Sequence, residues 1–313
     1  MKIIVTESIA LEGIEHLKSR GFDVDVKFGI SREDLLEIIG NYDALIVRSV
    51  TKVNEELMEK APNLKVVGRA GNGVDNIDLK AATARGIIVV NTPESNIMAA
   101  AELAVTHAYA IFRNLIQAVT AGRNKDFRRG KFIGNELDGK TAGIIGLGRI
   151  GSIVARKLMG SNMRVIAYDP YIDPAKVPDF VELVDFDTFL NSADIVSLHC
   201  IVSPQTKKMF NKETFAKMKK GSYFINTARG ELVVEEDLID ALNSHHLAGA
   251  AIDVTIEEPI ASDCPLLTAE NLIITPHIAG SAYDVQVCGT QMVCDTLEDW
   301  LENKKPRNCV VYK

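Results

Sequence analysis

The stretch Gly146-Leu147-Gly148-Arg149-Ile150-Gly151 follows an apolar run at 141–145 and opens an amphipathic run that ends at Leu158. An acid, Asp169, closes the next β-branched run, eighteen residues after Gly151. Glycines at this spacing permit a tight turn between a strand and a helix, where backbone N–H groups and the helix N-terminus attract a pyrophosphate. The acid can accept hydrogen bonds from both ribose hydroxyls. The stretch therefore predicts a dinucleotide site, although a glycine-rich turn of an ordinary βαβ unit would give a similar pattern.

Short runs rich in β-branched residues alternate with helical patterns along the chain, which is typical of α/β folds. Five expected strands lie in the first third of the chain, at 2–6, 23–28, 44–48, 65–69 and 87–91. Six more follow Lys140, at 141–146, 164–168, 195–199, 223–227, 248–253 and 272–277. Six strands are what a full dinucleotide-binding sheet needs. A long helix is expected from about 97 to 121 and a final one from about 283 to 302.

Composition and charge exclude several classes of protein. The chain has 313 residues, 47% of them hydrophobic, and 35 basic against 42 acidic residues give a net charge of −7, which argues against non-specific nucleic-acid binding. The most apolar long stretch, 97–112, contains Glu102 and His107 and is too short and too polar to span a membrane. Five scattered cysteines without C-x-x-C spacing fit reduced thiols. Because no signal-peptide pattern follows Met1, we expect a cytoplasmic protein, and no metal site is expected.

Polar residues end the expected strands of the second series, where ligands of parallel sheets bind. They are Asp169, His199, Arg229, Asp253 and His277, and Glu258 lies in the loop after Asp253. An imidazole can take the hydroxyl proton of a 2-hydroxy acid, a carboxylate can orient that imidazole, and an arginine can bind the substrate carboxylate through two parallel N–H bonds. Taken singly, each residue also fits a strand end, a solvated loop or a surface turn. Their position on successive strands favours a dehydrogenase site.

These motifs together resemble the D-2-hydroxyacid dehydrogenase family. The likeness covers nearly the whole chain and is carried by segments 146–151, 226–230, 251–259 and 275–277. It implies that Arg229 binds substrate, that His277 is the acid/base with Glu258 as its partner, and that Asp253 holds the nicotinamide carboxamide. It further implies two doubly wound parallel-sheet domains, with a Rossmann dinucleotide-binding domain (97–283) inserted into a flavodoxin-like substrate domain (1–96 and 284–313).

The expected cofactor is NAD rather than NADP. Asp169 would repel a 2′-phosphate, and residues 170–173 contain no arginine to neutralise it. The resemblance implies cofactor contacts from Gly146, Gly148, Arg149, Ile150, Gly151, Asp169, His199, Thr227, Asp253 and His277.

Within the family, the likeness is greatest to the D-3-phosphoglycerate dehydrogenases, through segments 46–49, 67–78, 91–93 and 132–137. A substrate with a carboxylate and a phosphate needs several cations, and Arg48 and Arg69 stand at successive strand ends. The basic segment 128–131 offers more cations and, in the family, can reach a neighbouring subunit's site; the alternative is a solvated basic loop. The expected substrate contacts are Arg48, Ser49, Arg69, Asn72, Gly73, Arg128, Arg129 and Lys131.

The expected function is NAD-dependent oxidation of 3-phospho-D-glycerate to 3-phosphohydroxypyruvate, the first step of serine synthesis, by a homodimer or homotetramer. The alternatives are a hydroxypyruvate or glyoxylate reductase and, much less favoured, a non-catalytic corepressor-like scaffold that senses NAD. The chain departs from the family pattern at Ile201, where a proline is common, at Ala279, where a glycine is common, and at the polar Asn72. Since the chain ends soon after its last expected helix, we expect a short form without a C-terminal regulatory domain and with little inhibition by serine.

Overall fold

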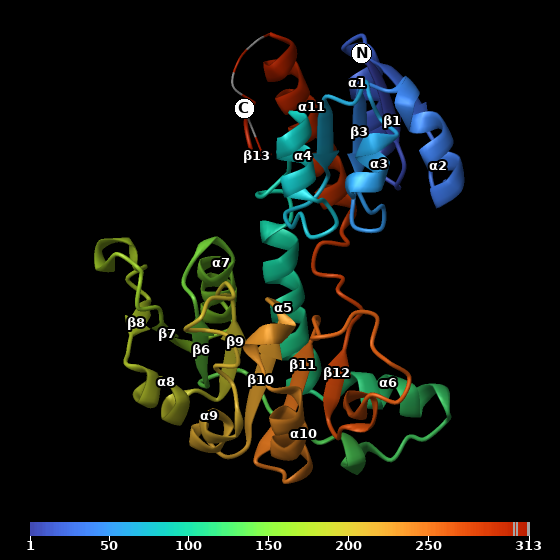
Figure 1. Cartoon of the computed structure of the whole chain (residues 1–313). Helices are drawn as coiled ribbons and strands as arrows, with labels where there is room; N and C mark the ends of the chain where they lie inside the picture. Colours follow the sequence, from blue (N-terminus) through green and yellow to red (C-terminus); the bar gives the residue numbers. More distant parts are fainter. Residues whose placement is uncertain (303, 305, 312–313) are drawn as a thin grey trace. The chain divides into compact units, whose positions relative to one another are not determined.

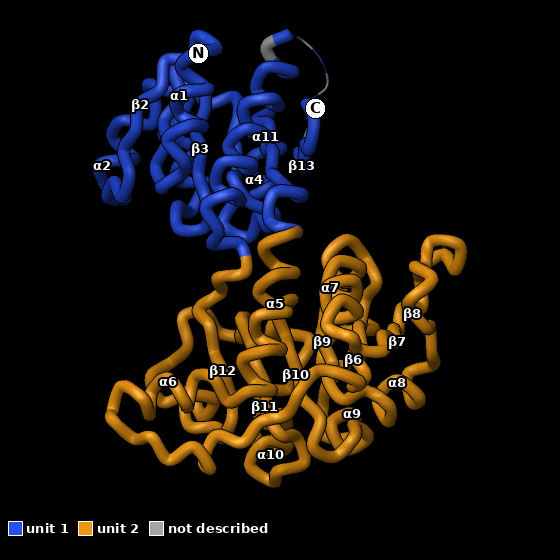
Figure 2. The backbone as a smooth tube through the Cα atoms, turned by 180° about the vertical axis from the view of Figure 1, so that it is seen from behind, with its two compact units in different colours: residues 1–97, 280–313 blue, residues 98–279 orange. Residues whose placement is uncertain are grey.

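The computed structural model describes residues 1–302, 304 and 306–311 of the chain, which divides into two compact units. Unit 1 comprises residues 1–97 and 280–313, and unit 2 comprises residues 98–279 (Figure 2). The dinucleotide-binding domain was expected at 97–283. Its expected start lies one residue before the start of unit 2, and its expected end lies four residues after the end of unit 2. In unit 1 the last helix, α11 (Tyr283–Leu301), packs on the first, α1 (Leu11–Ser19), so α11 completes the unit in which the chain begins.

Unit 1 contains one sheet in the order β13-β5-β4-β3-β1-β2. Figure 1 labels β1, β3 and β13 of this sheet. Its strands are β1 (Lys2–Val5), β2 (Asp23–Val26), β3 (Ala44–Val47), β4 (Val66–Arg69), β5 (Ile88–Val90) and β13 (Cys309–Val311). The first five are parallel in the flavodoxin-like order 2-1-3-4-5, as predicted. The short strand β13, which pairs antiparallel with β5, was not expected from the sequence.

The sheet of unit 1 is covered on both faces. Its helices are α1 (Leu11–Ser19), α2 (Arg32–Ile38), α3 (Glu55–Glu59), α4 (Leu79–Arg85) and α11 (Tyr283–Leu301), with a 3₁₀ turn η1 (Ile39–Asn41). Along β3, Leu45 and Val47 join one buried cluster while Ala44 and Ile46 join the other. This alternation explains why β3 reads as a continuous apolar run rather than as an alternating one.

Unit 2 contains a parallel sheet in the order β12-β11-β10-β9-β6-β7-β8. Its strands are β6 (Thr141–Ile145), β7 (Arg164–Tyr168), β8 (Val181–Leu183), β9 (Ile195–Leu198), β10 (Ser222–Asn226), β11 (Leu247–Ile252) and β12 (Leu272–Ile274). The order reverses beside β6, as in the Rossmann fold, so the carboxyl ends of β6 and β9 flank the switch point where dinucleotides bind. The six expected strands are present, and the short edge strand β8 is an addition.

The helices of unit 2 cover both faces of this sheet. They are α5 (Ile97–Phe112), α6 (Leu115–Arg123), α7 (Arg149–Met159), α8 (Phe186–Ser192), α9 (Lys212–Lys217) and α10 (Glu235–Asn243), with 3₁₀ turns η2 (Arg129–Phe132), η3 (Pro174–Lys176), η4 (Gly230–Leu232) and η5 (Pro265–Thr268). The expected single helix over 97–121 is wrong, because Asn114 has a left-handed φ of 48° that separates α5 from α6. Among the described residues, no helix has both the length and the apolar character needed to cross a bilayer.

Candidate functional site

The glycine turn connects β6 to α7, and each glycine has a different steric role. Gly146 has a φ of 85°, and a Cβ there would lie 2.9 Å from the backbone of His199 and Cys200. At Gly151 a Cβ would lie 2.0 Å from the carbonyl oxygen of Gly146, so only glycine lets α7 start this close to the turn. Gly148, the N-cap of α7, has nothing within 4 Å of an added Cβ. The turn therefore leaves open space at the helix N-terminus, which fits a pyrophosphate.

Asp169 lies directly after β7 and contacts this turn. The Leu147 N–H donates to its Oδ2 over 2.8 Å, and the Tyr171 N–H donates to its Oδ1 over 2.9 Å. The side chain is partly exposed, and each carboxylate oxygen can accept a further hydrogen bond. The acid is thus fixed where ribose hydroxyls would meet it if a pyrophosphate occupied the turn.

Three other residues expected to contact the cofactor belong to the same region of unit 2. His199 follows β9, and its Nε2 shares a 2.8 Å hydrogen bond with the Ser197 hydroxyl; burial lowers the pKa of this imidazole, so it is neutral at pH 7. The Thr227 hydroxyl is buried and has no hydrogen-bond partner among the described residues. A buried, unsatisfied hydroxyl is costly, and it fits a site that a ligand completes. Ile150 is partly buried and packs on the core of unit 2.

The predicted acid/base pair is in hydrogen-bond contact. His277 Nδ1 lies 2.7 Å from Glu258 Oε2, and Glu258 Oε1 accepts a hydrogen bond of 3.0 Å from the Thr255 N–H. His277 itself has a left-handed φ of 53° just after Pro276. With Nδ1 held by the carboxylate, Nε2 is the nitrogen that can exchange a proton with a ligand. The half-exposed pair can therefore act as a general acid or base.

Asp253 organises the segment that carries His277. Its carboxylate, 1% exposed, accepts hydrogen bonds from the Thr275 hydroxyl and from the N–H groups of Ile278, at 2.9 Å, and Ala279, at 2.8 Å. These contacts make Asp253 a support of the 275–279 turn. Its contact with the nicotinamide carboxamide stays a prediction.

Two residues that are linked to Asp253 by hydrogen bonds, Thr275 and His107, were not predicted as site residues from the sequence. The hydroxyl of Thr275 lies 3.3 Å from Nε2 of His107, which is buried in α5. Burial lowers the pKa of His107 while the charge of Asp253 acts in the opposite direction, and the net shift is downward. The available signal was a single histidine within the apolar run 97–112.

The loop that carries Arg229 is closed by Asn226 at the end of β10. The Asn226 amide donates to the Arg229 carbonyl over 2.8 Å and accepts from the Ala228 N–H over 3.0 Å. The next residue, Gly230, packs so closely on the loop after β11 that a Cβ would lie 2.2 Å from the Thr255 backbone. The exposed arginine therefore stands on a rigid loop beside the loop that holds Glu258.

Two predicted substrate cations, Arg48 and Arg69, lie at the carboxyl ends of neighbouring central strands of the unit 1 sheet. Arg69 ends β4 and is the register partner of Val47, the last residue of β3, and Arg48 is the next residue after Val47. The Arg69 guanidinium lies over Gly71, where a Cβ would come within 1.7 Å of Nη1. Both arginines are partly exposed, and the predicted contacts Ser49, Asn72 and Gly73 occupy the two loops that follow β3 and β4.

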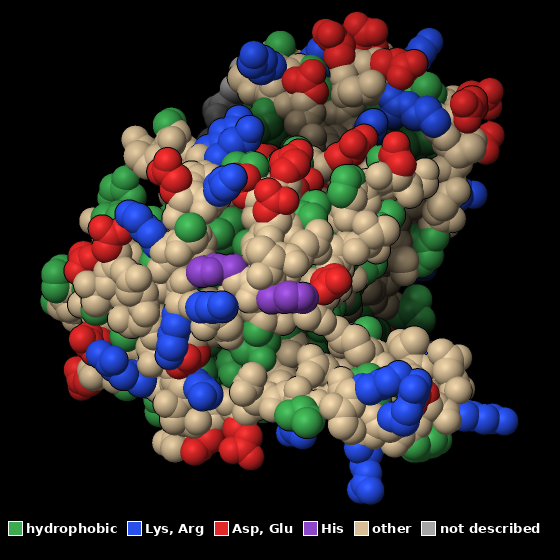
Figure 3. All heavy atoms as spheres, turned by 90° about the horizontal axis from the view of Figure 1, so that it is seen from below, with side chains coloured by type: hydrophobic (Ala, Val, Ile, Leu, Met, Phe, Trp, Pro, Cys, Tyr) green, Lys and Arg blue, Asp and Glu red, His purple; other side chains and the backbone are tan. Residues whose placement is uncertain are grey.

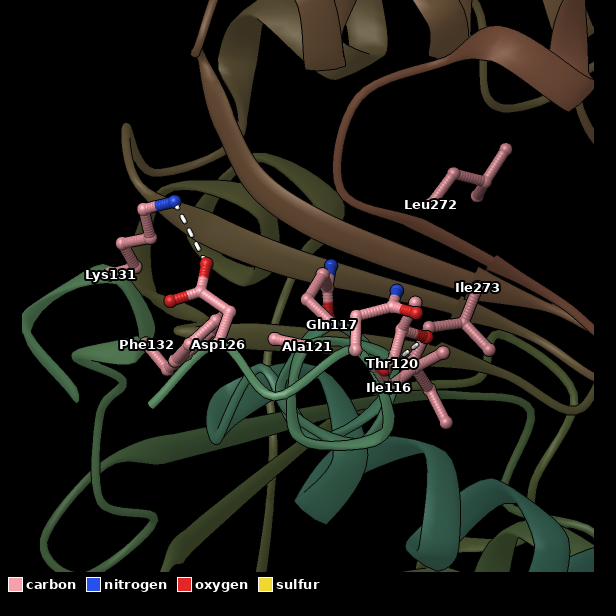
Figure 4. Close-up of a pocket in the computed structure, with 10 residues that line it drawn as sticks. Ile116, Gln117, Thr120, Ala121, Asp126, Lys131, Phe132, Leu272 and Ile273 are labelled. Carbon is pink, nitrogen blue, oxygen red and sulfur yellow. Dashed lines mark hydrogen bonds and ion pairs between the residues drawn. The ribbon is translucent and has the colours of Figure 1, made fainter. Parts of the chain in front are cut away.

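The basic segment 128–131 lies elsewhere, in unit 2 beside the edge strand β12. Arg128 and Lys131 both form ion pairs with Asp126, and the hydrogen bonds from these two side chains hold the pKa of that carboxyl well below its usual range. Lys131 and Asp126 line a cavity of about 490 Å³ together with α6 and the start of β12 (Figure 4). The structure therefore shows a basic loop with its own acid; a role for Arg128, Arg129 and Lys131 at a substrate site stays a prediction.

Charge on the surface is mixed. On the face seen in Figure 3, Lys and Arg side chains are interspersed with Asp and Glu side chains.

Comparison with known proteins places these motifs in a family. The model described as "D-isomer specific 2-hydroxyacid dehydrogenase, NAD binding domain" matches residues 105–279, nearly all of unit 2. D-3-phosphoglycerate dehydrogenase of Archaeoglobus fulgidus is 42% identical over 311 residues, which are 99% of this chain and 59% of that protein. The chloroplastic D-3-phosphoglycerate dehydrogenase 2 of Arabidopsis thaliana is 45% identical over 287 residues, 91% of this chain and 46% of that protein. The chain thus spans about half the length of these relatives.

A solved structure is similar over the whole chain. NAD-dependent formate dehydrogenase from Staphylococcus aureus, in complex with NAD, is 31% identical with a TM-score of 0.81 and covers 100% of this chain and 99% of that one. The family model matched over residues 105–279 identifies unit 2 as an NAD-binding domain.

Proposed function

Because the chain belongs to the D-isomer specific 2-hydroxyacid dehydrogenase family, we propose that it catalyses NAD-dependent oxidation of 3-phospho-D-glycerate to 3-phosphohydroxypyruvate, the first step of serine synthesis. The observation that carries the proposal is the 2.7 Å hydrogen bond between His277 and Glu258, whose loop packs on the loop that holds Arg229. Relatives named D-3-phosphoglycerate dehydrogenase support the choice of substrate.

The residues of unit 2 divide the chemistry between them. The glycine turn and Asp169 would hold NAD, which would supply an acceptor for the hydride on C2 of the substrate. His277 takes the C2 hydroxyl proton on Nε2, since Nδ1 is held by Glu258, and the adjacent carboxylate stabilises the resulting imidazolium. Arg229 binds the substrate carboxylate through two parallel N–H bonds. In the reverse direction the same imidazolium returns the proton to the C2 oxygen.

The residues of unit 1 account for the phosphate. Arg48 and Arg69 stand at adjacent strand ends, and a substrate with two anionic groups needs several cations. An unphosphorylated 2-hydroxy acid, as in a hydroxypyruvate or glyoxylate reductase, would need only one. The two arginines therefore favour the phosphorylated substrate.

The direct test is a comparison of initial rates with phosphohydroxypyruvate, hydroxypyruvate, glyoxylate and pyruvate, each with NADH and with NADPH. We expect the highest kcat/KM for phosphohydroxypyruvate with NADH. A higher value for hydroxypyruvate or glyoxylate would replace the proposed substrate while leaving the reaction type intact. Absence of turnover with all four would contradict the dehydrogenase assignment.

We also propose a homo-oligomer, a dimer or a tetramer, in which a second copy covers the face formed by α6 and the segment after it. No residue of α6 is buried, and Phe127 and Ile133 are 79% and 81% exposed. Exposed apolar side chains gathered in one place are typical of protein interfaces. Light scattering should give a multiple of 34.2 kDa, and Val119→Glu should lower it; a monomeric wild-type protein would contradict the proposal.

The cytoplasm is the proposed compartment. Cys200, Cys264, Cys288 and Cys294 are free thiols, which fits a reducing environment. Cell fractionation followed by detection of the protein tests this location.

A further inference from the structure

The loop after β3, residues 48–51, is held by a single carboxylate from the end of β1. Glu7 Oε1 accepts hydrogen bonds from the N–H groups of Arg48, at 3.0 Å, and Thr51, at 2.8 Å. Its Oε2 accepts from the N–H groups of Ser49 and Val50, both at 3.0 Å. Four consecutive backbone donors therefore converge on one side chain that is 41 residues away from the nearest of them in the sequence.

The carbonyl groups of the same loop are held from the other side. The Asn76 amide, in the segment after β4, donates to the carbonyl oxygens of Arg48 over 3.0 Å and of Thr51 over 2.8 Å. The hydroxyls of Thr6 and Thr51 share a further hydrogen bond of 2.9 Å. The loop is thus fixed at both ends by groups that follow the strands on either side of β3.

The loop at 48–51 has little apolar packing that could hold it in place. Ser49 and Val50 are exposed, Val50 to 79%, so hydrophobic burial does not hold them in place. Hydrogen bonds to an ionised carboxylate are roughly twice as strong as bonds between neutral groups. Burial alone would raise the pKa of Glu7, but the N–H groups of Thr51, Val50 and Arg48 lower it overall, so the carboxylate is charged at neutral pH.

The backbone of the loop also cannot serve a ligand as an anion site, since Glu7 already occupies its four N–H groups. What the loop can present to an anionic substrate is side chains, those of Arg48 and Ser49. A side chain on an ordered loop binds more tightly than one on a mobile loop, because less conformational entropy is lost on binding.

We propose that Glu7 is a positioning residue for substrate recognition: with Asn76 it orders residues 48–51 so that Arg48 and Ser49 are held ready for a phosphorylated substrate. This inference rests on the proposed function for the identity of the substrate, although the ordering of the loop does not depend on it.

The test uses Glu7→Gln, which keeps the size of the side chain and removes its charge. We expect KM for phosphohydroxypyruvate to rise by about tenfold, the equivalent of one lost charge-assisted contact, with kcat and the Kd of NADH little changed. Glu7→Asp, which keeps the charge, should restore part of the loss. Glu15→Gln is the matched control, because it makes the same change at an exposed position of α1 that does not contact the loop.

Hydrogen exchange separates this proposal from the proposed function. In Glu7→Gln the amides of residues 48–51 should exchange faster than in the wild type and in Glu15→Gln, whichever substrate the enzyme prefers. If Glu7→Gln does not fold, Asn76→Ala loosens the same loop from its carbonyl side and should give the same KM and exchange changes. A folded variant with unchanged KM or unchanged exchange at 48–51 would overturn the proposal, as would equal losses of kcat on every substrate. Wild-type inactivity on phosphohydroxypyruvate with protected amides at 48–51 would overturn the proposed function alone.

Discussion

The turn after β6 in unit 2 and the loop after β3 in unit 1 both begin at the carboxyl end of a buried parallel strand, yet they are built in opposite ways. The first is shaped by its own glycines, and Gly148 leaves free space at the start of α7. The second contains no glycine and is held by the carboxylate of Glu7 and the amide of Asn76. The first therefore keeps room for a ligand, whereas the second has used its backbone N–H groups and offers only side chains.

This difference fits the proposal that residues of unit 2 carry out the chemistry and that residues of unit 1 recognise the substrate. In unit 2 the residues proposed for chemistry contact one another, as His277 and Glu258 do. In unit 1, of the arginines proposed for recognition, Arg48 stands on a loop fixed by Glu7 and Asn76, and Arg69 ends strand β4. Changes in unit 2 should alter turnover of every substrate, whereas changes in unit 1 should alter affinity for the phosphorylated substrate alone.

The largest effect is expected at His277. His277→Ala should lower kcat roughly 10²–10⁴-fold, because the proton acceptor is lost. The loss should be similar on phosphohydroxypyruvate and hydroxypyruvate, and the Kd of NADH, measured by fluorescence, should change little. Glu258→Gln, the control for the pair, should lower kcat less than His277→Ala does, since the imidazole remains. A loss confined to the phosphorylated substrate would remove His277 from the shared chemistry.

The preference for NADH over NADPH tests the proposed role of Asp169 beside the glycine turn. The carboxylate of Asp169 would face the 2′-phosphate of NADPH, and such like-charge contact costs on the order of several kcal/mol, roughly a hundredfold or more in efficiency. We therefore expect kcat/KM with NADH to exceed that with NADPH by about this factor, and Asp169→Ala to narrow the gap. Comparable efficiencies in the wild-type protein would contradict this role for Asp169.

Arg69 tests the recognition side of the comparison. Arg69→Ala should lower kcat/KM for phosphohydroxypyruvate by about tenfold to a hundredfold, the cost of one charge-assisted contact. The loss on hydroxypyruvate, which has no phosphate, should be much smaller. Equal fractional losses on the two substrates would show that Arg69 is structural or binds the carboxylate, and would favour the reductase alternative.

The smallest effects on turnover are expected from the glycines of the turn after β6. Gly151→Ala forces a Cβ to within 2.0 Å of the Gly146 carbonyl oxygen and should destabilise unit 2 by about 1–3 kcal/mol, seen as a lower Tm. Gly148→Ala meets no protein atom, so Tm should stay close to the wild-type value while the Kd of NADH rises. Equal losses of Tm would show that the space at Gly148 is not reserved for a ligand.

The sequence by itself determined the α/β class, both parallel sheets and the glycine turn with its acid, because strand and helix periodicities and the steric freedom of glycine are local properties. It also indicated that Glu258 and His277 belong to loops at the ends of neighbouring strands. It did not predict the break at Asn114 or the short edge strands β8 and β13, where local patterns are weak.

Only the tertiary structure decided how residues distant in the chain meet. It brought Nδ1 of His277 to Glu258, linked His107 to Thr275 and Asp253, and set the carboxylate of Glu7 against a loop that begins 41 residues later. Glu7 lies outside every segment that the sequence singled out. Asn76 lies in segment 67–78, but no role was expected for it, and the contacts of both residues follow only from the strand register of unit 1. Such contacts depend on which strands are neighbours and on their register, and those are properties of the assembled sheet rather than of any segment within it.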